Sequence, residues 1–315
     1  MSPQLLAPTS GPITDAARVR GMALYSRPTW QQPVFGAISG VVATTIVVLS
    51  GLSAFAALAL FPLICVYWYL GRHSRSELGF VPGRLRHYGV GLLHPALVLG
   101  AIALAAWVGG AINTSGTDWS AAGIGFLTTM LVTILMGLLT EEGFFRGWLW
   151  SSLRRAGVGP GGLVMWSSLA WSLWHVPVLL WGTDIEASAA QVPIYLASAF
   201  TIGIIWGMFR LISGSIVVTS VVHGLWNGAV YVFFGMGATE GALGIQETVL
   251  YGPEVGVLGL AINIVIAIEL GRWHLRTNRK RPARVQPDPS VELPLDTVPK
   301  ARGGASNGPE AENHN

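Results

Sequence analysis

Long apolar runs separated by short polar stretches dominate the pattern along this chain. Most of the runs reach the roughly 17–25 residues that an α-helix needs to cross a bilayer. Eight such segments are predicted, at about 34–50, 53–70, 88–110, 121–153, 162–181, 192–211, 215–235 and 254–272. The pattern therefore predicts an all-α polytopic membrane protein, a bundle of about eight transmembrane helices.

Two of these segments need separate treatment because of their length. The first apolar run extends from Val34 to Leu70, and we divide it at the turn signal Ser50-Gly51-Leu52-Ser53. The fourth segment, 121–153, exceeds one bilayer crossing, so its helix must tilt, bend or project beyond the membrane.

Polar sequence flanks the membrane domain, which we place at 34–272. Residues 1–33 predict a flexible tail, and they lack the short apolar core and cleavage site of a removable signal peptide. Residues 273–315 are rich in proline, arginine and small residues, which predicts a second, disordered tail.

The composition supports a membrane protein and excludes several other classes. The 315 residues are 51% hydrophobic and only 11% charged, whereas a soluble domain carries about a quarter charged residues. The formal net charge of +3 could indicate a nucleic-acid partner, but the position of the charges along the chain argues against one. The single cysteine, Cys65, allows neither an intrachain disulfide nor a cysteine-based metal site.

Charge also predicts the orientation in the membrane. With eight spans, all 19 lysines and arginines except Arg146 lie on one side, and the opposite loops carry acidic residues and no basic ones. The positive-inside rule then places both termini in the cytoplasm. We expect a multi-pass protein of the cell membrane.

Few ionisable side chains lie within the predicted spans, and such residues indicate function by default. The fourth span contains Glu141-Glu142-Gly-Phe-Phe-Arg146, in which Glu142 and Arg146 are spaced i, i+4 and can pair. Glu141 is turned about 100° away and stays free. The fifth span supplies Trp171 and His175, and the seventh supplies His223 and Asn227 on one helix face.

These residues are expected to meet at one depth. At about 1.5 Å per residue, Glu141, His175, His223 and Asn227 lie roughly 18, 21, 13 and 20 Å from the cytoplasmic helix ends. A carboxylate and an imidazole can activate a water, and a second imidazole with an amide can stabilise an oxyanion. Alternatively, Glu141, His175 and His223 could hold a divalent metal such as zinc with an open position for water.

The three motifs together resemble the CPBP family, the CAAX proteases and bacteriocin-processing enzymes also called Abi-type proteases. That family carries EExxxR, FxxxH and HxxxN in this order. The first motif is matched at Glu141–Arg146 and the third at His223–Asn227, whereas the second has Trp171 in place of phenylalanine before His175. The resembling core covers about 121–235.

The resemblance implies an intramembrane endopeptidase of glutamic or metalloprotease type. It assigns Glu141 as the water-activating base assisted by His175, His223 and Asn227 as the oxyanion-stabilising pair, and Glu142 with Arg146 as support. Trp171, one turn before His175, is expected to support the site by walling off the imidazole. The implied partners are the lipid bilayer and a peptide or membrane-associated protein. Prenylated CAAX proteins, bacteriocin processing and bacteriocin immunity all remain open as substrates or roles.

Two other functions are compatible with the same residues. A proton-coupled transporter also uses intramembrane glutamate, histidine and arginine, although the chain shows no convincing internal repeat. A catalytically silent membrane scaffold is the second alternative, against which the retention of all four chemical positions weighs.

Overall fold

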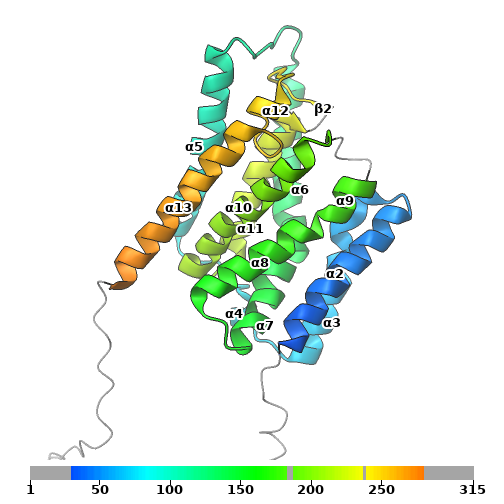
Figure 1. Ribbon diagram of the computed structural model, residues 1–315, viewed down its shortest axis with the longest axis vertical. Coiled ribbons are helices and arrows are strands. Elements are labelled where there is room, and N and C mark those ends of the chain that lie inside the picture. The colour runs from blue at the N-terminus through cyan, green and yellow to red at the C-terminus, as the bar shows by residue number, and fades with distance from the viewer. Residues whose placement is uncertain (1–29, 183–186, 237–238, 280–315) are drawn as a thin grey trace, which may run out of the picture. The chain divides into compact units, whose positions relative to one another are not determined.

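Helices that are long and apolar enough to cross a membrane make up most of the structure, a computed structural model that describes residues 30–182, 187–236 and 239–279 (Figure 1). Within those ranges there are eight such spans. They comprise α2 (Gln31–Leu49); η1 (Ser53–Ala59) with α3 (Leu60–Gly71); α5 (Leu85–Val108); α6 (Trp119–Leu139) with η2 (Glu142–Leu149) and α7 (Trp150–Arg155); α8 (Pro160–Trp174) with α9 (Val176–Trp181); α10 (Gln191–Ser213); α11 (Ile216–Ala229) with η3 (Val230–Phe234); and α13 (Val257–Arg279).

The remaining described elements are short. They are the helices α4 (Arg75–Leu78) and α12 (Thr248–Tyr251) and the strands β1 (Gly235–Met236) and β2 (Thr239–Glu240). The strands pair antiparallel, with Gly235 opposite Glu240 and Met236 opposite Thr239. Among the described residues, those up to Trp273 form one compact unit, and a second unit begins at His274 within α13.

The predicted all-α bundle with eight spans is confirmed, with small shifts in the boundaries. The first helix begins at Gln31 rather than near 34, and the last continues to Arg279 rather than ending near 272. The greater part of both predicted tails, 1–29 and 280–315, lies outside the described residues. The cytoplasmic orientation of the termini stays a prediction.

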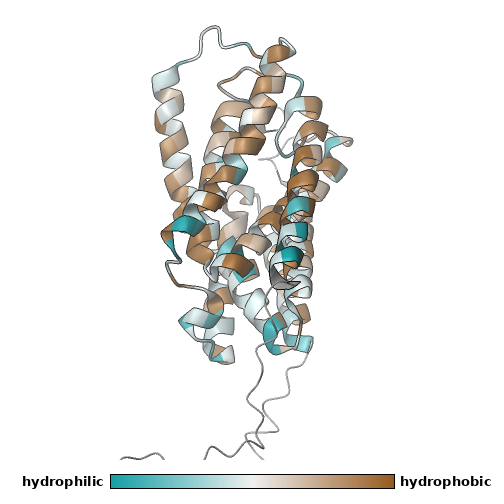
Figure 2. Ribbon diagram, turned by 90° about the vertical axis from the view of Figure 1, so that its left-hand side faces the viewer, coloured by the Kyte–Doolittle hydropathy of each residue, from teal (hydrophilic) through white to brown (hydrophobic). Residues whose placement is uncertain are grey.

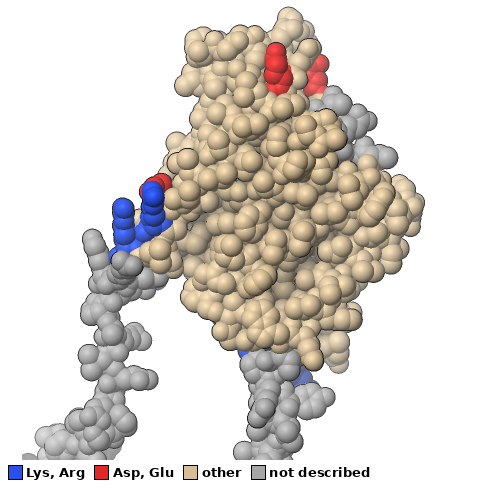
Figure 3. All heavy atoms as spheres, in the orientation of Figure 1, with Lys and Arg blue, Asp and Glu red and all other residues tan. Residues whose placement is uncertain are grey.

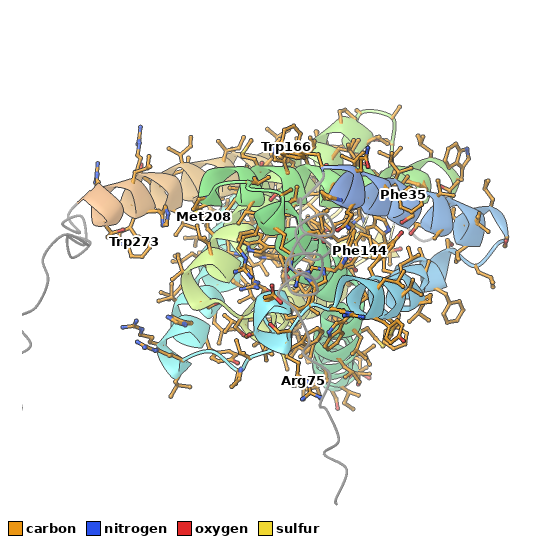
Figure 4. The ribbon with its side chains drawn as sticks, turned by 90° about the horizontal axis from the view of Figure 1, so that it is seen from below. Phe35, Arg75, Phe144, Trp166, Met208 and Trp273 are labelled. Carbon is orange, nitrogen blue, oxygen red and sulfur yellow. The ribbon has the colours of Figure 1, made fainter. Side chains whose placement is uncertain are left out.

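The outer surface of the bundle is apolar, as a lipid environment requires. Phe35, Leu131 and Trp166 are half or more exposed, whereas the hydroxyl side chains of Ser167 and Thr219 are completely buried. Figure 2 shows hydrophobic residues along the outer helices, and the broad middle of the face drawn in Figure 3 shows no charged side chain. Figure 4 shows Phe35 and Trp166 on the outside and Phe144, which is fully buried, toward the interior. In lipid, the buried polar groups must find partners inside the protein.

Two helix pairs pack closely at the centre of the bundle, α6 with α11 and α8 with α10. A Cβ atom at Gly224 of α11 would lie 2.3 Å from Ile134 Cγ1 of α6, so the two backbones approach as only glycine permits. A Cβ atom at Gly203 of α10 would likewise lie 2.9 Å from the Cβ of Ser168 on α8. Small residues thus determine the spacing within each pair.

Two spans are interrupted where the sequence carries its polar motifs. In the fourth span, Thr140 departs from helical geometry with φ −120° and ψ −91°, and a π-helical segment, η2, follows from Glu142. This irregularity lies in the span whose length predicts a tilt, a bend or a projection beyond the membrane. In the fifth span, α8 ends at Trp174 and α9 restarts beyond His175, with Pro177 in its first turn. Since proline lacks a backbone donor and crowds the preceding turn, it accounts for this break.

Candidate active site

A small polar cavity inside the bundle brings the predicted site residues together. It has a volume of about 40 Å³. At roughly 10–15 Å³ for one water, that is room for about three waters. The lining residues are Glu141, Trp171, His175, Tyr195, Ala199, Ile202, Trp206, His223, Asn227, Tyr231 and Glu254. The four residues for which the sequence predicts chemistry, Glu141, His175, His223 and Asn227, are all among them.

Glu141 stands at the junction between α6 and the π-helical segment η2. The indole Nε1–H of Trp171 donates a hydrogen bond of 2.8 Å to its Oε2. This bond fixes one carboxylate oxygen and leaves the other for the cavity. The guanidinium of Arg146 lies 4.3 Å from the centre of the Trp171 ring, so the same indole also carries a cation–π contact.

Glu142 does not line the cavity and belongs to a completely buried ion pair. Arg146 NH1 lies 3.3 Å from its Oε1, and neither side chain has any exposed surface. The i, i+4 pairing that the sequence predicts is therefore present. The same Oε1 also lies 3.2 Å from His223 Nδ1, a contact that the spacing of the motifs does not predict. Glu142 thus joins the arginine of its own segment to the imidazole of α11.

His175 occupies the break between α8 and α9, which gives its ring an unusual partner. Its backbone N–H bonds to Ser172 O, and the carbonyl of Trp171 instead accepts the Nδ1–H of the imidazole at 2.9 Å. Because a carbonyl oxygen only accepts, Nδ1 carries the proton and Nε2 of the neutral ring keeps a lone pair. The Trp171 ring packs edge-on against this imidazole at 4.9 Å, consistent with its predicted supporting position.

His223 and Asn227 lie on successive turns of α11, so their side chains share a face as predicted. The Glu142 carboxylate accepts from His223 Nδ1–H, which leaves Nε2 as the second functional nitrogen of the ring. Asn227 is half-buried at the cavity and carries an amide that can both donate and accept. One helix therefore presents an imidazole nitrogen and an amide to one space.

Sequence reasoning misses several lining residues, most importantly Glu254. Tyr231 continues the i, i+4 series from His223 and Asn227, so spacing alone could have found it. Glu254 belongs to the loop before α13, and no local pattern relates it to the motifs. It is only 8% exposed, and Trp226 Nε1–H donates a 2.6 Å hydrogen bond to its Oε1.

The metal site that the sequence leaves open is not supported by the arrangement of donors. Among the described residues, no group of three or more His, Cys, Asp or Glu side chains is placed to hold a metal ion. Glu141 Oε2 and the Nδ1 atoms of both imidazoles are bonded to protein groups, which leaves one oxygen and the two Nε2 atoms, and these are not grouped for a metal among the described residues. The proposed mechanism therefore uses directly activated water.

Comparison with known families gives one match, and it covers the motif-bearing helices. The family model described as Rce1-like, type II CAAX prenyl endopeptidase, matches residues 123–229. The matched segment includes all four predicted chemical residues from Glu141 to Asn227. No curated protein matches the chain.

Proposed function

We propose that this chain, which belongs to the CPBP and CAAX protease family through the Rce1-like domain at residues 123–229, cleaves peptide bonds with water activated by Glu141. The family match and the eight apolar helices make the protein a CAAX-protease-like, multi-pass membrane peptidase. The observation that supports the finer proposal is the shared cavity, in which carboxylate, imidazoles and amide from three spans surround space for water.

Activation of the water is the role of Glu141 and His175. The free oxygen of Glu141 and the lone pair of His175 Nε2 both accept hydrogen bonds from one water. Glu141 takes its proton as the oxygen attacks the peptide carbonyl, a contribution of about 10²–10⁴-fold in rate for a positioned base. Trp171 holds the carboxylate in place through the 2.8 Å bond to Oε2.

Stabilisation of the tetrahedral intermediate is the role of His223 and Asn227. Glu142 holds the ring through Nδ1, and a His223 imidazolium would donate from Nε2 to the oxyanion. The Asn227 amide supplies another N–H. Removal of one such donor costs about 10²–10³-fold in rate. Arg146 balances the buried charge of Glu142, so that the carboxylate can hold the imidazole.

The proposal is tested by cleavage of a fluorogenic farnesylated peptide that ends in Cys-aliphatic-aliphatic-X, together with its unmodified counterpart, by purified protein in detergent. We expect Glu141→Gln to lower kcat by about 10²–10⁴-fold while the thermal transition stays unchanged. The matched control is Glu240→Gln, an exposed carboxylate on β2, which should cleave at the wild-type rate.

Two results would overturn the proposal. Cleavage by Glu141→Gln at the wild-type rate would remove the base from the mechanism. Wild-type protein that cleaves neither peptide but drives a proton-gradient-dependent solute flux in proteoliposomes would favour a transporter, and loss of both activities would favour a scaffold.

A further inference from the structure

A second carboxyl group lines the cavity, and the mechanism above gives it no role. Glu254 lies three residues before α13, and only 8% of its surface is exposed. Its Oε1 accepts from Trp226 Nε1 at 2.6 Å. Its Oε2 is buried without a hydrogen-bond partner among the described residues. A buried polar atom that has no partner in the protein normally bonds to water or to a ligand, and the cavity beside Glu254 has room for either.

The size of the cavity places Glu254 close to the reacting atoms. A space for about three waters keeps its lining groups within reach of each other through one or two waters. Glu141 and Glu254 therefore act on the same small volume from different elements, the α6–η2 junction and the loop before α13.

The two carboxyl groups have opposite surroundings, which suits them to opposite tasks. Glu141 receives a hydrogen bond from an indole that also lies under the Arg146 guanidinium, so a cation stands close to it. Glu254 has one indole donor, from Trp226, and no ion pair among the described residues. Pairs of carboxyls with unlike environments divide into base and acid in many enzymes.

We propose that Glu254 is the general acid of the peptidase reaction, which passes its carboxylic proton to the nitrogen of the departing amine. This inference rests on the proposed function. An O–H bond of water breaks and its proton goes to Glu141, while the water oxygen bonds to the carbonyl carbon. The C–N bond then breaks, and its electron pair on nitrogen takes the proton of Glu254. Proton transfer from Glu141 to Glu254 through cavity water restores the starting state.

The protonation of Glu254 is consistent with this role. Burial raises the pKa of Glu254 to about 7, although the Trp226 hydrogen bond and the nearby His223 oppose the rise and Glu141 adds to it. Tyr195 and Tyr231 also face the same cavity. Because the acid must carry its proton, amide cleavage should decline as the pH rises through about 7.

The test compares two substrates that differ in their need for an acid. One is the farnesylated peptide, and the other is its thioester analogue at the scissile bond, whose thiolate leaves without a proton. We expect Glu254→Gln to lower kcat by about 10²-fold or more on the amide and to change the thioester rate little. Glutamine preserves the oxygen that accepts from Trp226, and Glu247→Gln, an exposed carboxylate just before α12, is the control.

Wild-type protein gives a second measurement that does not depend on how a variant folds. Its kcat for the amide should fall above about pH 7, and its kcat for the thioester, corrected for spontaneous hydrolysis, should lack that decline. Identical profiles for the two substrates, or equal losses on both in Glu254→Gln, would assign Glu254 a structural role and overturn the proposal.

The outcomes also separate this inference from the function on which it rests. If wild type cleaves the amide, Glu141→Gln does not, and Glu254→Gln cleaves at the full rate, the acid assignment fails and the peptidase stands. If wild type cleaves neither substrate, the peptidase itself fails and the acid assignment fails with it.

Discussion

Two glutamate–arginine pairs of this protein have the same chemistry in opposite surroundings. Glu77 and Arg155 are about a third exposed and have the better geometry, since Arg155 Nε and NH2 reach the carboxylate at 3.0–3.1 Å. Glu142 and Arg146 have no exposed surface and one contact of 3.3 Å. Geometry alone would make the exposed pair the stronger of the two.

The partners of each pair explain the difference. Arg155 also donates to the carbonyl of Gly71, and Glu77 closes a capping box with Ser74, so the exposed pair ties α3, α4 and α7 together. The Oε1 atom of Glu142 contacts both Arg146 and His223. The exposed pair thus fastens backbone, whereas the buried pair orients a side chain of the cavity. The number of hydrogen bonds in a pair therefore says little about what its loss would cost.

The largest effect on stability is expected from breaking the buried pair. Arg146→Met strands the Glu142 charge in the protein interior, which should lower the free energy of unfolding by about 3–5 kcal/mol. The loss is measured by denaturant titration in detergent. The double variant Glu142→Gln/Arg146→Met removes the stranded charge, so it should regain part of that loss. A single variant no less stable than the double would contradict this account.

The next effect concerns the indole between Arg146 and Glu141. Trp171→Phe introduces the phenylalanine of the family motif and keeps an aromatic ring, but it removes the hydrogen bond from the indole to Glu141. A hydrogen bond to a charged group contributes about 1.5–3 kcal/mol, so kcat should fall about 10- to 100-fold. Trp148→Phe, a buried tryptophan that stacks on Tyr67, is the control and should retain activity. Wild-type kcat in Trp171→Phe would show that the indole merely packs.

A smaller loss of stability is expected when the pH is lowered, because of a histidine beside the exposed pair Glu77–Arg155. His73 lies beside it and bonds to Ser151, and burial, with the charge of Arg155, lowers its pKa to about 4 from 6.5. The folded state therefore binds a proton less readily than the unfolded chain, so its stability is highest above pH 6.5. We expect a loss of the order of 1–3 kcal/mol between pH 6.5 and about 4. His73→Asn should flatten that slope, and an unchanged slope would contradict the assignment.

The smallest effect is expected from breaking the exposed pair itself. Arg155→Ala should cost about 1 kcal/mol or less, with a smaller loss at high salt. Burial opposes ionisation of Glu77, but bonds from the Ser74 backbone and Arg155 lower its pKa to about 2 from 4.5. Its contribution is thus present above pH 4.5 and declines toward pH 2. A loss in Arg155→Ala as large as that in Arg146→Met would erase the contrast between the two pairs.

Much of the fold and part of the site can be predicted from the sequence, because they depend on patterns within single helical segments. The eight spans follow from apolar length, and the pairing of Glu142 with Arg146 follows from helical spacing. The meeting of Glu141, His175, His223 and Asn227 follows from their depth within each helix.

The rest depends on contacts between segments that have no sequence signature. Spacing does not reveal that Glu142 reaches His223, because that contact depends on how η2 faces α11. The π-helical segment itself has no compositional signal. Glu254 reaches the cavity from a loop, where periodicity does not apply, and its acidity made it resemble a solvated residue.

The glycine-mediated approach of the central helices has a consequence for how a substrate could enter. Gly224 lets α6 and α11 approach closely, and Gly203 does the same for α8 and α10, so we expect each pair to behave as one block. The cavity is lined from both pairs, with Glu141, His223 and Asn227 from α6 and α11 and His175 from the end of α8. If the two pairs parted to admit a peptide, His175 would move away from Glu141 and His223, so we expect the complete set of side chains to assemble only after closure around the bound chain.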